Sequence, residues 1–324
     1  MTVQSNFDTL VTVYGGSGFL GRHVVRALAK RHYRIRVAVR RPDLAFHLQP
    51  LGRVGQIHAV QANLRDARSV EAAARDAQVL VNLVGILKEG GRQRFDTIHS
   101  FGTEQVALAA SAHGARLVHV SAIGADENSS AGYARSKAVA ERLAFAAQPS
   151  AVVMRPSILF GPEDDFFNRF ASLARMSPVL PLIGGGHTKF QPVFAGDVAR
   201  AIADAVDGKL KAGTVYELGG PEVRTFKELM QFMLRTIERR RLLVPLPFFA
   251  AKLQAMVLQF APSPLTLTPG QVDMLRVDNV VSEAAKAEGR TLPGIGIEPE
   301  PIEAIVPSYL WRFRKTGQFR SRAA

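Results

Sequence analysis

Short apolar runs alternate with amphipathic segments over the first half of the chain, and this alternation restricts the fold more than any other feature. The apolar runs have the length and β-branched content of buried strands, whereas the segments between them carry the 3.6-residue period of helices. The runs cover residues 10–14, 34–39, 57–61, 79–85, 116–121 and 151–155. Near-continuous apolar strands separated by helices are typical of a parallel sheet that is covered on both faces. The sequence therefore predicts an α/β chain with a doubly wound parallel sheet, whose ligands bind beyond the carboxyl ends of the strands.

The pattern changes after Pro156, where longer loops rich in glycine and proline separate mixed helices. We expect residues 1–156, with returning segments near 190–220, to form the domain that contains the sheet. Residues 157–324 are expected to form a smaller mixed C-terminal lobe on the partner or substrate side.

Several classes of site are excluded by composition. Cysteine is absent from the 324 residues, which excludes disulfides and thiolate metal ligands. The eight histidines are scattered without ligand spacing, so we expect no metal site. The N-terminal residues lack a basic segment followed by an apolar one, and no run of about 18 apolar residues occurs. We therefore expect a cytoplasmic chain that does not span a membrane.

A glycine-rich turn, VYGGSGFLG, follows the first predicted strand and precedes an amphipathic helix. Its spacing places Gly15, Gly18 and Gly21 where a tight turn lets backbone N–H groups approach a pyrophosphate at the positive end of the helix. In this strand, turn and helix context the motif predicts a Rossmann-type dinucleotide site. Phe19 and Leu20, at the start of the helix, are expected to border the cofactor.

The residues after the second predicted strand indicate which dinucleotide binds. NAD sites usually place a carboxylate there, against the ribose 2′-hydroxyl. This chain instead carries Arg40 and Arg41, in the run VAVRRPD. Paired guanidinium groups favour a dianionic 2′-phosphate through charge-assisted hydrogen bonds. We therefore predict NADP(H) as the cofactor in preference to NAD(H).

Tyr133 and Lys137 are four residues apart in YARSKAVAE, a spacing that stacks them on one face of a helix. An ammonium near a phenol is expected to lower the pKa of the phenol and make it a usable general acid or base. Ser121 ends a predicted strand, where its hydroxyl can donate a hydrogen bond to a substrate carbonyl. The three residues are candidates for catalysis, although Tyr133 and Lys137 also suit a nucleotide that is held and never turned over.

The chain resembles the extended and atypical short-chain dehydrogenase/reductase superfamily over nearly its whole length. The resemblance is carried by VYGGSGFLG, NLVG, VHVSAIGA, YARSKAVAE and MRPSILFGPED, which occur in the family's order. It implies that Arg40 contacts the 2′-phosphate and that Asn63 and Leu64 border the adenine. It further implies cofactor contacts for the motif residues Val84, Gly85 and Pro156.

Two residues depart from the superfamily's pattern. Tyr14 stands where a threonine commonly precedes the glycine motif, and His99 stands where catalytic members usually carry an asparagine. That asparagine takes part in a proton relay in active members. The histidine weakens the case for turnover without removing it, because an imidazole can also donate and accept hydrogen bonds.

A narrower resemblance is carried by RPSILFGPEDDFFNRFASLARMSPVLPL, FQPVFAGDVARAI and VPLPFFAAK. These runs are similar to those of the NAD(P)H-binding accessory subunits of respiratory complex I, the NADH:ubiquinone oxidoreductase. The resemblance implies a tightly held NADPH with a structural role, and a C-terminal lobe docked on complex I subunits at the cytoplasmic face of the inner membrane. Two rival functions stay open. One is a soluble NADP-dependent oxidoreductase or epimerase/dehydratase that uses Ser121, Tyr133 and Lys137, and the other is a redox-sensing regulator that binds a dinucleotide and a partner.

The net charge of +13 is concentrated toward the C-terminus, where basic residues gather in 235–260 and 312–322. Residues 242–260 are the most apolar stretch, but prolines interrupt it and make it too broken for a transmembrane helix. We expect this stretch to lie on an anionic membrane surface, against a partner subunit or in the core of its own lobe. The closing aromatic and basic residues form too short a cluster to favour nucleic acid as the partner.

Overall fold

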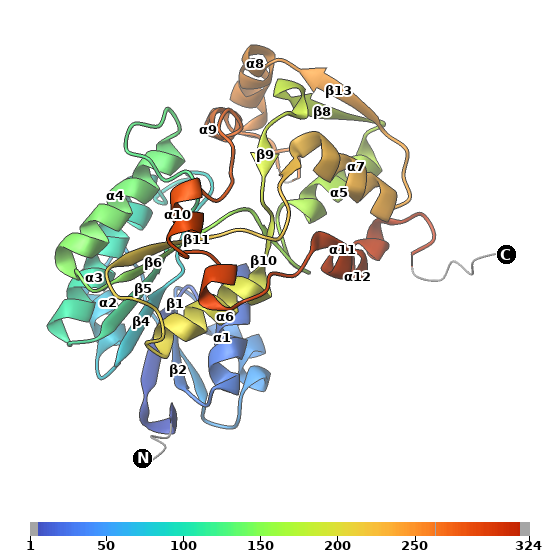
Figure 1. Cartoon of the computed structure of the whole chain (residues 1–324). Coiled ribbons are helices and arrows are strands. Elements are labelled where there is room, and N and C mark those ends of the chain that lie inside the picture. Colours follow the sequence, from blue (N-terminus) through green and yellow to red (C-terminus); the bar gives the residue numbers. More distant parts are fainter. Residues whose placement is uncertain (1–5, 263, 318–324) are drawn as a thin grey trace. The chain divides into compact units, whose positions relative to one another are not determined.

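The computed structural model describes residues 6–262 and 264–317 (Figure 1). The chain divides into a sheet unit (Met1–Pro156, Gly196–Leu218 and Ala284–Ile297) and a C-terminal unit (Ser157–Ala195, Gly219–Glu283 and Glu298–Ala324). Arg320 and Arg322, which belong to the basic cluster noted in the sequence, lie outside the described residues. That the C-terminal unit faces a partner or a substrate stays a prediction.

A seven-stranded parallel sheet forms the centre of the sheet unit, with the strand order β11-β6-β5-β4-β1-β2-β3. The strands are β1 (Leu10–Tyr14), β2 (Arg34–Val39), β3 (Ile57–Gln61), β4 (Val79–Asn82), β5 (Arg116–Val120), β6 (Val152–Pro156) and β11 (Thr214–Leu218). This confirms the predicted doubly wound parallel sheet. The chain order reverses between β1 and β4, so the ligand crevice of such a sheet is expected at the carboxyl ends of these two strands.

Helices cover both faces of this sheet (Figure 1). The side chains of α2, α3 and α4 join Leu80 and Leu117 of the sheet in one buried cluster on one face, and α1 and α6 lie on the other face. The helical segments are η1 (Asn6–Asp8), α1 (Phe19–Lys30), η2 (Pro42–Leu51), α2 (Ala67–Ala74), the π-helix η3 (Asp96–Phe101), α3 (Gly102–Ala112), α4 (Gly132–Ala147), α6 (Ala195–Val206), α10 (Glu283–Ala287) and η5 (Pro293–Ile295).

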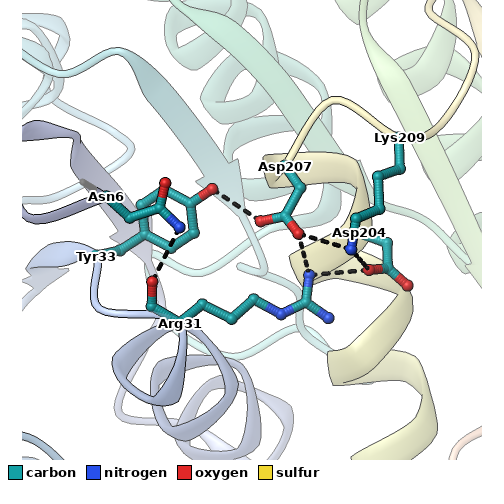
Figure 2. Close-up of polar contacts among 6 residues, drawn as sticks. All are labelled: Asn6, Arg31, Tyr33, Asp204, Asp207 and Lys209. Atoms are coloured by element: carbon teal, nitrogen blue, oxygen red, sulfur yellow. Dashed lines mark hydrogen bonds and ion pairs between the residues drawn. The ribbon is translucent and has the colours of Figure 1, made fainter. Parts of the chain in front are cut away.

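A polar cluster, which we call the α1–α6 latch, joins the end of α6 to the end of α1 (Figure 2). Arg31 Nη1 lies 2.9 Å from Asp204 Oδ1 and 2.7 Å from Asp207 Oδ2. The Tyr33 hydroxyl donates to Asp207 at 2.8 Å, and Lys209 pairs with the same two carboxylates. The latch therefore attaches a helix that returns late in the sequence to the segment between α1 and β2 of the sheet unit.

Three two-stranded sheets and several helices form the C-terminal unit. Its strands are β7 (Leu159–Phe160), β8 (Val179–Ile183), β9 (Lys189–Phe190), β10 (Val193–Phe194), β12 (Arg224–Thr225) and β13 (Leu242–Leu246). Its helical segments are α5 (Phe167–Met176), η4 (Gly184–Gly186), α7 (Phe226–Thr236), α8 (Phe248–Leu258), α9 (Pro269–Met274), α11 (Ile302–Ile305), α12 (Pro307–Leu310) and η6 (Trp311–Phe313). Phenylalanines of α5, α7 and β9 pack together in its core, where the Tyr309 hydroxyl donates to the buried Asp164.

The apolar stretch 242–260 forms β13 and α8, separated at Pro247, the residue that caps α8. α8 buries Ala251 and Ala255 completely within its own unit. Phe248 packs against the same buried cluster, whereas other large side chains form an exposed apolar face, where Phe249 is 70% and Val257 is 73% exposed. The exposed apolar face of α8 consists of Phe249, Leu253, Met256, Val257 and the following Phe260. Among the described residues, no helix is both long enough and apolar enough to cross a membrane.

Candidate functional site

The glycine-rich turn lies between the carboxyl end of β1 and the first residue of α1, where only small residues fit. Gly15 adopts a left-handed φ of 80°, and its carbonyl accepts a hydrogen bond from the Gly18 N–H at 3.1 Å. A Cβ at Gly21 would lie 2.5 Å from the Gly15 oxygen, closer than non-bonded atoms approach. A Cβ at Gly16 would lie 2.9 Å from Val37, so this glycine, which the sequence prediction omitted, belongs to the same packing. The turn fits the close backbone approach that a pyrophosphate needs.

Phe19 and Leu20 are the first two residues of α1, as the sequence predicted for the start of that helix. Leu20 is buried, whereas Phe19 is half-buried and its ring meets His23 edge-on at 5.7 Å. Gly18 caps the helix with an extended backbone and offers no side-chain acceptor. The N–H groups of the first turn of α1 are therefore not satisfied by a capping side chain, which suits an anionic ligand.

Arg40 and Arg41 follow β2 but have different environments. Arg41 forms a two-point contact with Asp43, with Nε 3.0 Å from Oδ1 and Nη2 2.7 Å from Oδ2. Asp43 also raises the pKa of Arg41. Arg40 is exposed, and its guanidinium has no polar partner within the described part of the chain. Of the two predicted contacts to a 2′-phosphate, Arg40 is thus the one that is available.

Asn63 and Leu64 follow β3, on the far side of β2 from the glycine turn. The Asn63 side-chain oxygen accepts a hydrogen bond from the Arg65 backbone at 3.2 Å. Leu64 is buried and packs against Gly102, where a Cβ would lie 2.9 Å from the Leu64 Cβ. The Leu64 side chain therefore belongs to the core, and a contact of this residue with an adenine stays a prediction.

Val84 and Gly85 lie just beyond β4, and Pro156 ends β6. The Val84 N–H donates to the Asn82 side chain at 3.2 Å, which shapes the loop after the strand. A Cβ at Gly85 would lie 3.3 Å from Lys137 Nζ, so this loop passes directly over the lysine. Pro156 is buried, and its carbonyl accepts a hydrogen bond from the Ile123 N–H at 3.0 Å.

Ser121 lies directly after β5, whereas Tyr133 and Lys137 lie in the first two turns of α4. Lys137 is buried, and its Nζ donates to the Val120 carbonyl at 3.0 Å. Burial lowers the pKa of Lys137 to about 8, although Glu141 opposes the shift. Ser121 Oγ is buried and has no hydrogen-bond partner among the described residues, as expected for a hydroxyl that awaits a ligand.

The prediction that Lys137 lowers the pKa of Tyr133 is wrong. Burial raises the pKa of Tyr133 to about 12. The Lys137 ammonium instead donates to the Val120 carbonyl, and burial of the phenol is the cause of its raised pKa. The spacing of the two residues thus places them on one helix but does not by itself activate the phenol.

His99 was noted in the sequence only as a departure from the superfamily's pattern. In the structure its imidazole joins two segments by hydrogen bonds. The Ile86 N–H donates to His99 Nε2 at 2.9 Å, and His99 Nδ1 lies 2.8 Å from Ser136 Oγ. The Ser136 hydroxyl in turn donates to the Tyr133 carbonyl at 2.8 Å. Sequence reasoning missed Ser136 because serine at an interior helix position carries no signal of its partner.

Tyr14, the second departure, is completely buried in β1. Its hydroxyl donates to the Val70 carbonyl at 2.7 Å. Burial raises the pKa of this phenol, so Tyr14 stays neutral and acts as a packing residue between β1 and α2.

A metal centre is not formed by the described residues, because no three histidine, aspartate or glutamate side chains gather in a ligating group. The site is thus built from a glycine turn, one available arginine and the Ser121, Tyr133 and Lys137 group. All of these lie at the carboxyl ends of the strands within the sheet unit. Their contacts with a cofactor stay predictions.

Comparison with known proteins places this arrangement in a family. A model of the NAD dependent epimerase/dehydratase family matches residues 11–219. The chain is 35% identical over 320 residues to "NADH dehydrogenase (ubiquinone) 1 alpha subcomplex subunit 9, mitochondrial" of Arabidopsis thaliana, covering 95% of this chain and 79% of the relative. It is 37% identical over 174 residues to the ceramide reductase of Caulobacter vibrioides, covering 54% of each chain.

Among solved structures, the NADPH-dependent quinone oxidoreductase QOR2 of Escherichia coli, complexed with NADPH, is similar with a TM-score of 0.72. The two chains are 20% identical, and the match covers 93% of this chain and 99% of that chain. This likeness shows the shared fold. The family match and the Arabidopsis relative confirm both resemblances stated from the sequence, and the chain belongs to the NAD dependent epimerase/dehydratase family, in the branch that includes the alpha subcomplex subunit 9 of NADH dehydrogenase (ubiquinone).

Proposed function

We propose that this protein is an NADP(H)-binding accessory subunit of a respiratory NADH:ubiquinone oxidoreductase, in which the nucleotide is held and not turned over. The observation that carries the proposal is the extent of the match to the Arabidopsis subunit. That match covers 95% of this chain and so continues through the C-terminal unit, beyond residues 11–219 of the family model. A sheet unit alone would support only dinucleotide binding.

The choice of NADP(H) is supported by Arg40. Its exposed guanidinium is free of polar partners within the described residues and follows β2, where a ribose 2′-substituent lies in folds of this class. A guanidinium matches the geometry and charge of a phosphate. Gly15, Gly18 and Gly21 would hold the pyrophosphate at the start of α1, and Asn63 with the Leu64 backbone would border the adenine.

At the other end of the site, Lys137 and the loop at Val84 and Gly85 would hold the nicotinamide riboside, and Pro156 would close it. When bound, the nicotinamide would supply a hydride donor or acceptor. Tyr133 remains protonated at neutral pH because burial raises its pKa to about 12. A protonated Tyr133 is compatible with a nucleotide that is bound but not turned over. Bound NADP(H) would stabilise the sheet unit, because a ligand that binds only the native state shifts the folding equilibrium toward it.

A second function, NADP-dependent oxidoreductase or epimerase chemistry, is favoured by one observation. Ser121 Oγ is buried and has no partner among the described residues, as a hydroxyl that polarises a substrate carbonyl would be before binding. In that function Tyr133 would give its proton to the carbonyl oxygen. NADPH oxidation with a carbonyl substrate, lost in Tyr133→Phe, would establish it.

For partners, we propose the subunits of the oxidoreductase together with the anionic surface of the membrane, on its inner, cytoplasmic face. The exposed apolar face of α8 provides a surface that can enter a lipid headgroup layer or pack on a hydrophobic subunit. Exposed cations of the same unit, Arg175, Arg235 and Arg240, favour an anionic surface.

The test is co-migration. The chain, tagged and produced at its native level, is expected to sediment with membranes and to run on a native gel in the band that oxidises NADH with ubiquinone. NADPH is expected in the extract of the denatured protein. A tagged chain found only in the soluble fraction would refute the accessory-subunit proposal, and a nucleotide-free protein that binds neither NADPH nor NADH would refute the cofactor.

A further inference from the structure

His99 has contacts that define a single protonation state. Its Nε2 accepts the hydrogen bond from the Ile86 N–H at 2.9 Å and therefore carries no proton. A neutral imidazole has one donor and one acceptor nitrogen, so Nδ1 is the donor and gives its proton to Ser136 Oγ at 2.8 Å. The Ser136 hydroxyl, which accepts from His99, donates its own proton to the Tyr133 carbonyl at 2.8 Å. One continuous chain of hydrogen bonds thus runs from Ile86 to Tyr133.

This chain of bonds joins two segments that are distant in sequence. Ile86 lies in the loop after β4, beside Gly85, whereas Tyr133 and Ser136 lie in the first two turns of α4. A Cβ at Gly85 would lie 3.6 Å from His99 Nε2 and 3.3 Å from Lys137 Nζ, so the loop rests on both side chains. The ring of His99 therefore sets the separation between the loop and the helix that line one end of the predicted nucleotide site.

Aromatic packing fixes the orientation of the ring. Phe95 stacks on His99 with centroids 5.4 Å apart and planes 26° apart. Tyr133 meets His99 edge-on at 5.6 Å. His99 itself is 1% exposed. It lies within the π-helix η3, and a π-turn of this kind is a rare local feature that is frequent at functional sites.

At neutral pH the His99 ring carries one proton and not a second one. Burial lowers the pKa of His99 to about 3, and the ammonium of Lys137 adds to the shift. Both nitrogens are engaged, one as acceptor and one as donor. His99 thus differs from a relay group, which must release a proton on one side while it takes one up on the other.

We infer that His99 is a positioning residue. Its imidazole, held in one tautomer, joins the Ile86 backbone to Ser136 and so keeps the nicotinamide end of the site closed around its nucleotide; we call this connection the His99 bracket. The inference rests on the proposed function, because it concerns how the same site retains a dinucleotide. Under this inference, the two hydrogen bonds of His99 slow the dissociation of the cofactor.

The first experiment measures the dissociation rate of NADPH from the full chain, by stopped-flow fluorescence with excess NADP⁺ as competitor. His99→Asn keeps an amide near the Nδ1 position and His99→Gln keeps one near the Nε2 position, so each loses one of the two bonds. We expect each to release NADPH about tenfold faster, and His99→Phe, which keeps the ring stacking but neither bond, about a hundredfold faster. The matched control is His113→Asn at the end of α3, where the imidazole bonds Glu71 on the surface; its rate should equal that of the wild type.

The second experiment does not depend on a variant. In ¹⁵N-histidine NMR of the wild type, His99 is expected as the neutral tautomer protonated at Nδ1, unchanged from pH 8 to pH 5 with or without NADPH. The ionisable groups that face it are Lys137 and Tyr133 of α4 and His119 of β5. A ring protonated at Nε2, or one that titrates in this range, would overturn the inference.

The outcomes separate the two proposals. A wild-type chain that binds no NADPH overturns the proposed function. NADPH that binds well but leaves His99→Asn, His99→Gln and His99→Phe at the wild-type rate overturns the bracket alone.

Discussion

Arg40 and Arg41 are adjacent in sequence, and the difference between them arises from one neighbour. Asp43 neutralises Arg41 through two hydrogen bonds, whereas Arg40 has no such partner within the described residues. A phosphate that bound Arg41 would have to displace this carboxylate. Residue identity therefore predicted a basic 2′-phosphate contact, and the local loop geometry selects which arginine can provide it.

The matched substitutions Arg40→Gln and Arg41→Gln test this selection. Arg40→Gln is expected to weaken NADPH binding by about 2 kcal/mol, roughly thirtyfold, because a charge-assisted hydrogen bond is lost. NADH binding should change little. Arg41→Gln should leave both affinities within about threefold. Isothermal titration with both nucleotides checks this, and equal losses of NADPH affinity in the two variants would contradict it.

His99 also predicts a dependence of stability on pH. Its folded-state pKa of about 3 lies below the usual 6.5, so the unfolded chain binds a proton that the native chain does not. The stabilisation is complete above about pH 6.5 and is lost as the pH falls toward 3. Between pH 6 and pH 4 the free energy of unfolding should therefore fall more steeply in the wild type than in His99→Asn, by about 1.4 kcal/mol per pH unit. Urea unfolding at several pH values measures this. Ser136→Ala keeps the imidazole and should keep the wild-type slope; an unchanged slope in His99→Asn would show that the native ring titrates normally.

At the scale of elements, the turn between β1 and α1 is limited by contacts between backbone atoms, which cannot move aside. Gly21→Ala would place a methyl group 2.5 Å from the Gly15 oxygen. We expect a loss of about 1–3 kcal/mol in the free energy of unfolding, and loss of nucleotide binding as the turn is displaced. Gly90→Ala is the control in the same unit, since its Cβ would meet no atom within 4 Å. Denaturant unfolding and NADPH titration of both variants test the prediction, which fails if Gly21→Ala binds NADPH as the wild type does.

The exposed apolar face of α8 has large side chains that do not pack within their own unit. Leu253→Glu combined with Val257→Glu should change the free energy of unfolding by less than about 0.5 kcal/mol, because both side chains are exposed. The same pair should lower binding to vesicles with anionic lipid at least about tenfold. Val223→Glu, at a position 48% exposed elsewhere in the unit, is the control for added charge. If the double variant sediments with vesicles as the wild type does, the face contacts something other than lipid.

At the scale of the whole molecule, the sheet unit is completed by segments from late in the sequence, and the α1–α6 latch holds one of them. Arg31→Met removes contacts to both Asp204 and Asp207 and leaves these half-buried carboxylates with less charge compensation. We expect a loss of about 1–3 kcal/mol in the free energy of unfolding. Arg142→Met removes an exposed pair with Glu127 and should cost less than about 1 kcal/mol. Urea unfolding compares them; equal small losses would mean that α6 is held by apolar packing alone.

Much of the sheet could be predicted because its signal is local. Six of the seven strands are largely apolar runs, and the central ones among them, such as β1 and β4, are buried on both faces of the sheet. β11 escaped prediction because an edge strand such as TVYEL need not be apolar. The glycine turn was predictable for a similar reason, since the spacing of Gly15, Gly18 and Gly21 records a backbone constraint directly in the sequence.

Sequence by itself determined the fold class and the family, and it named candidate residues for the site, because periodicity, glycine spacing and motif order are properties of neighbours along the chain. Tertiary structure alone decided the state of those residues. It pairs Arg41 with Asp43 and buries the Leu64 side chain in the core. It also raises the pKa of Tyr133, although the spacing to Lys137 predicted a lower pKa. It also connects His99 to Ile86 and Ser136. Burial and hydrogen bonding between distant segments set charge and proton position, and neither quantity is encoded in local spacing.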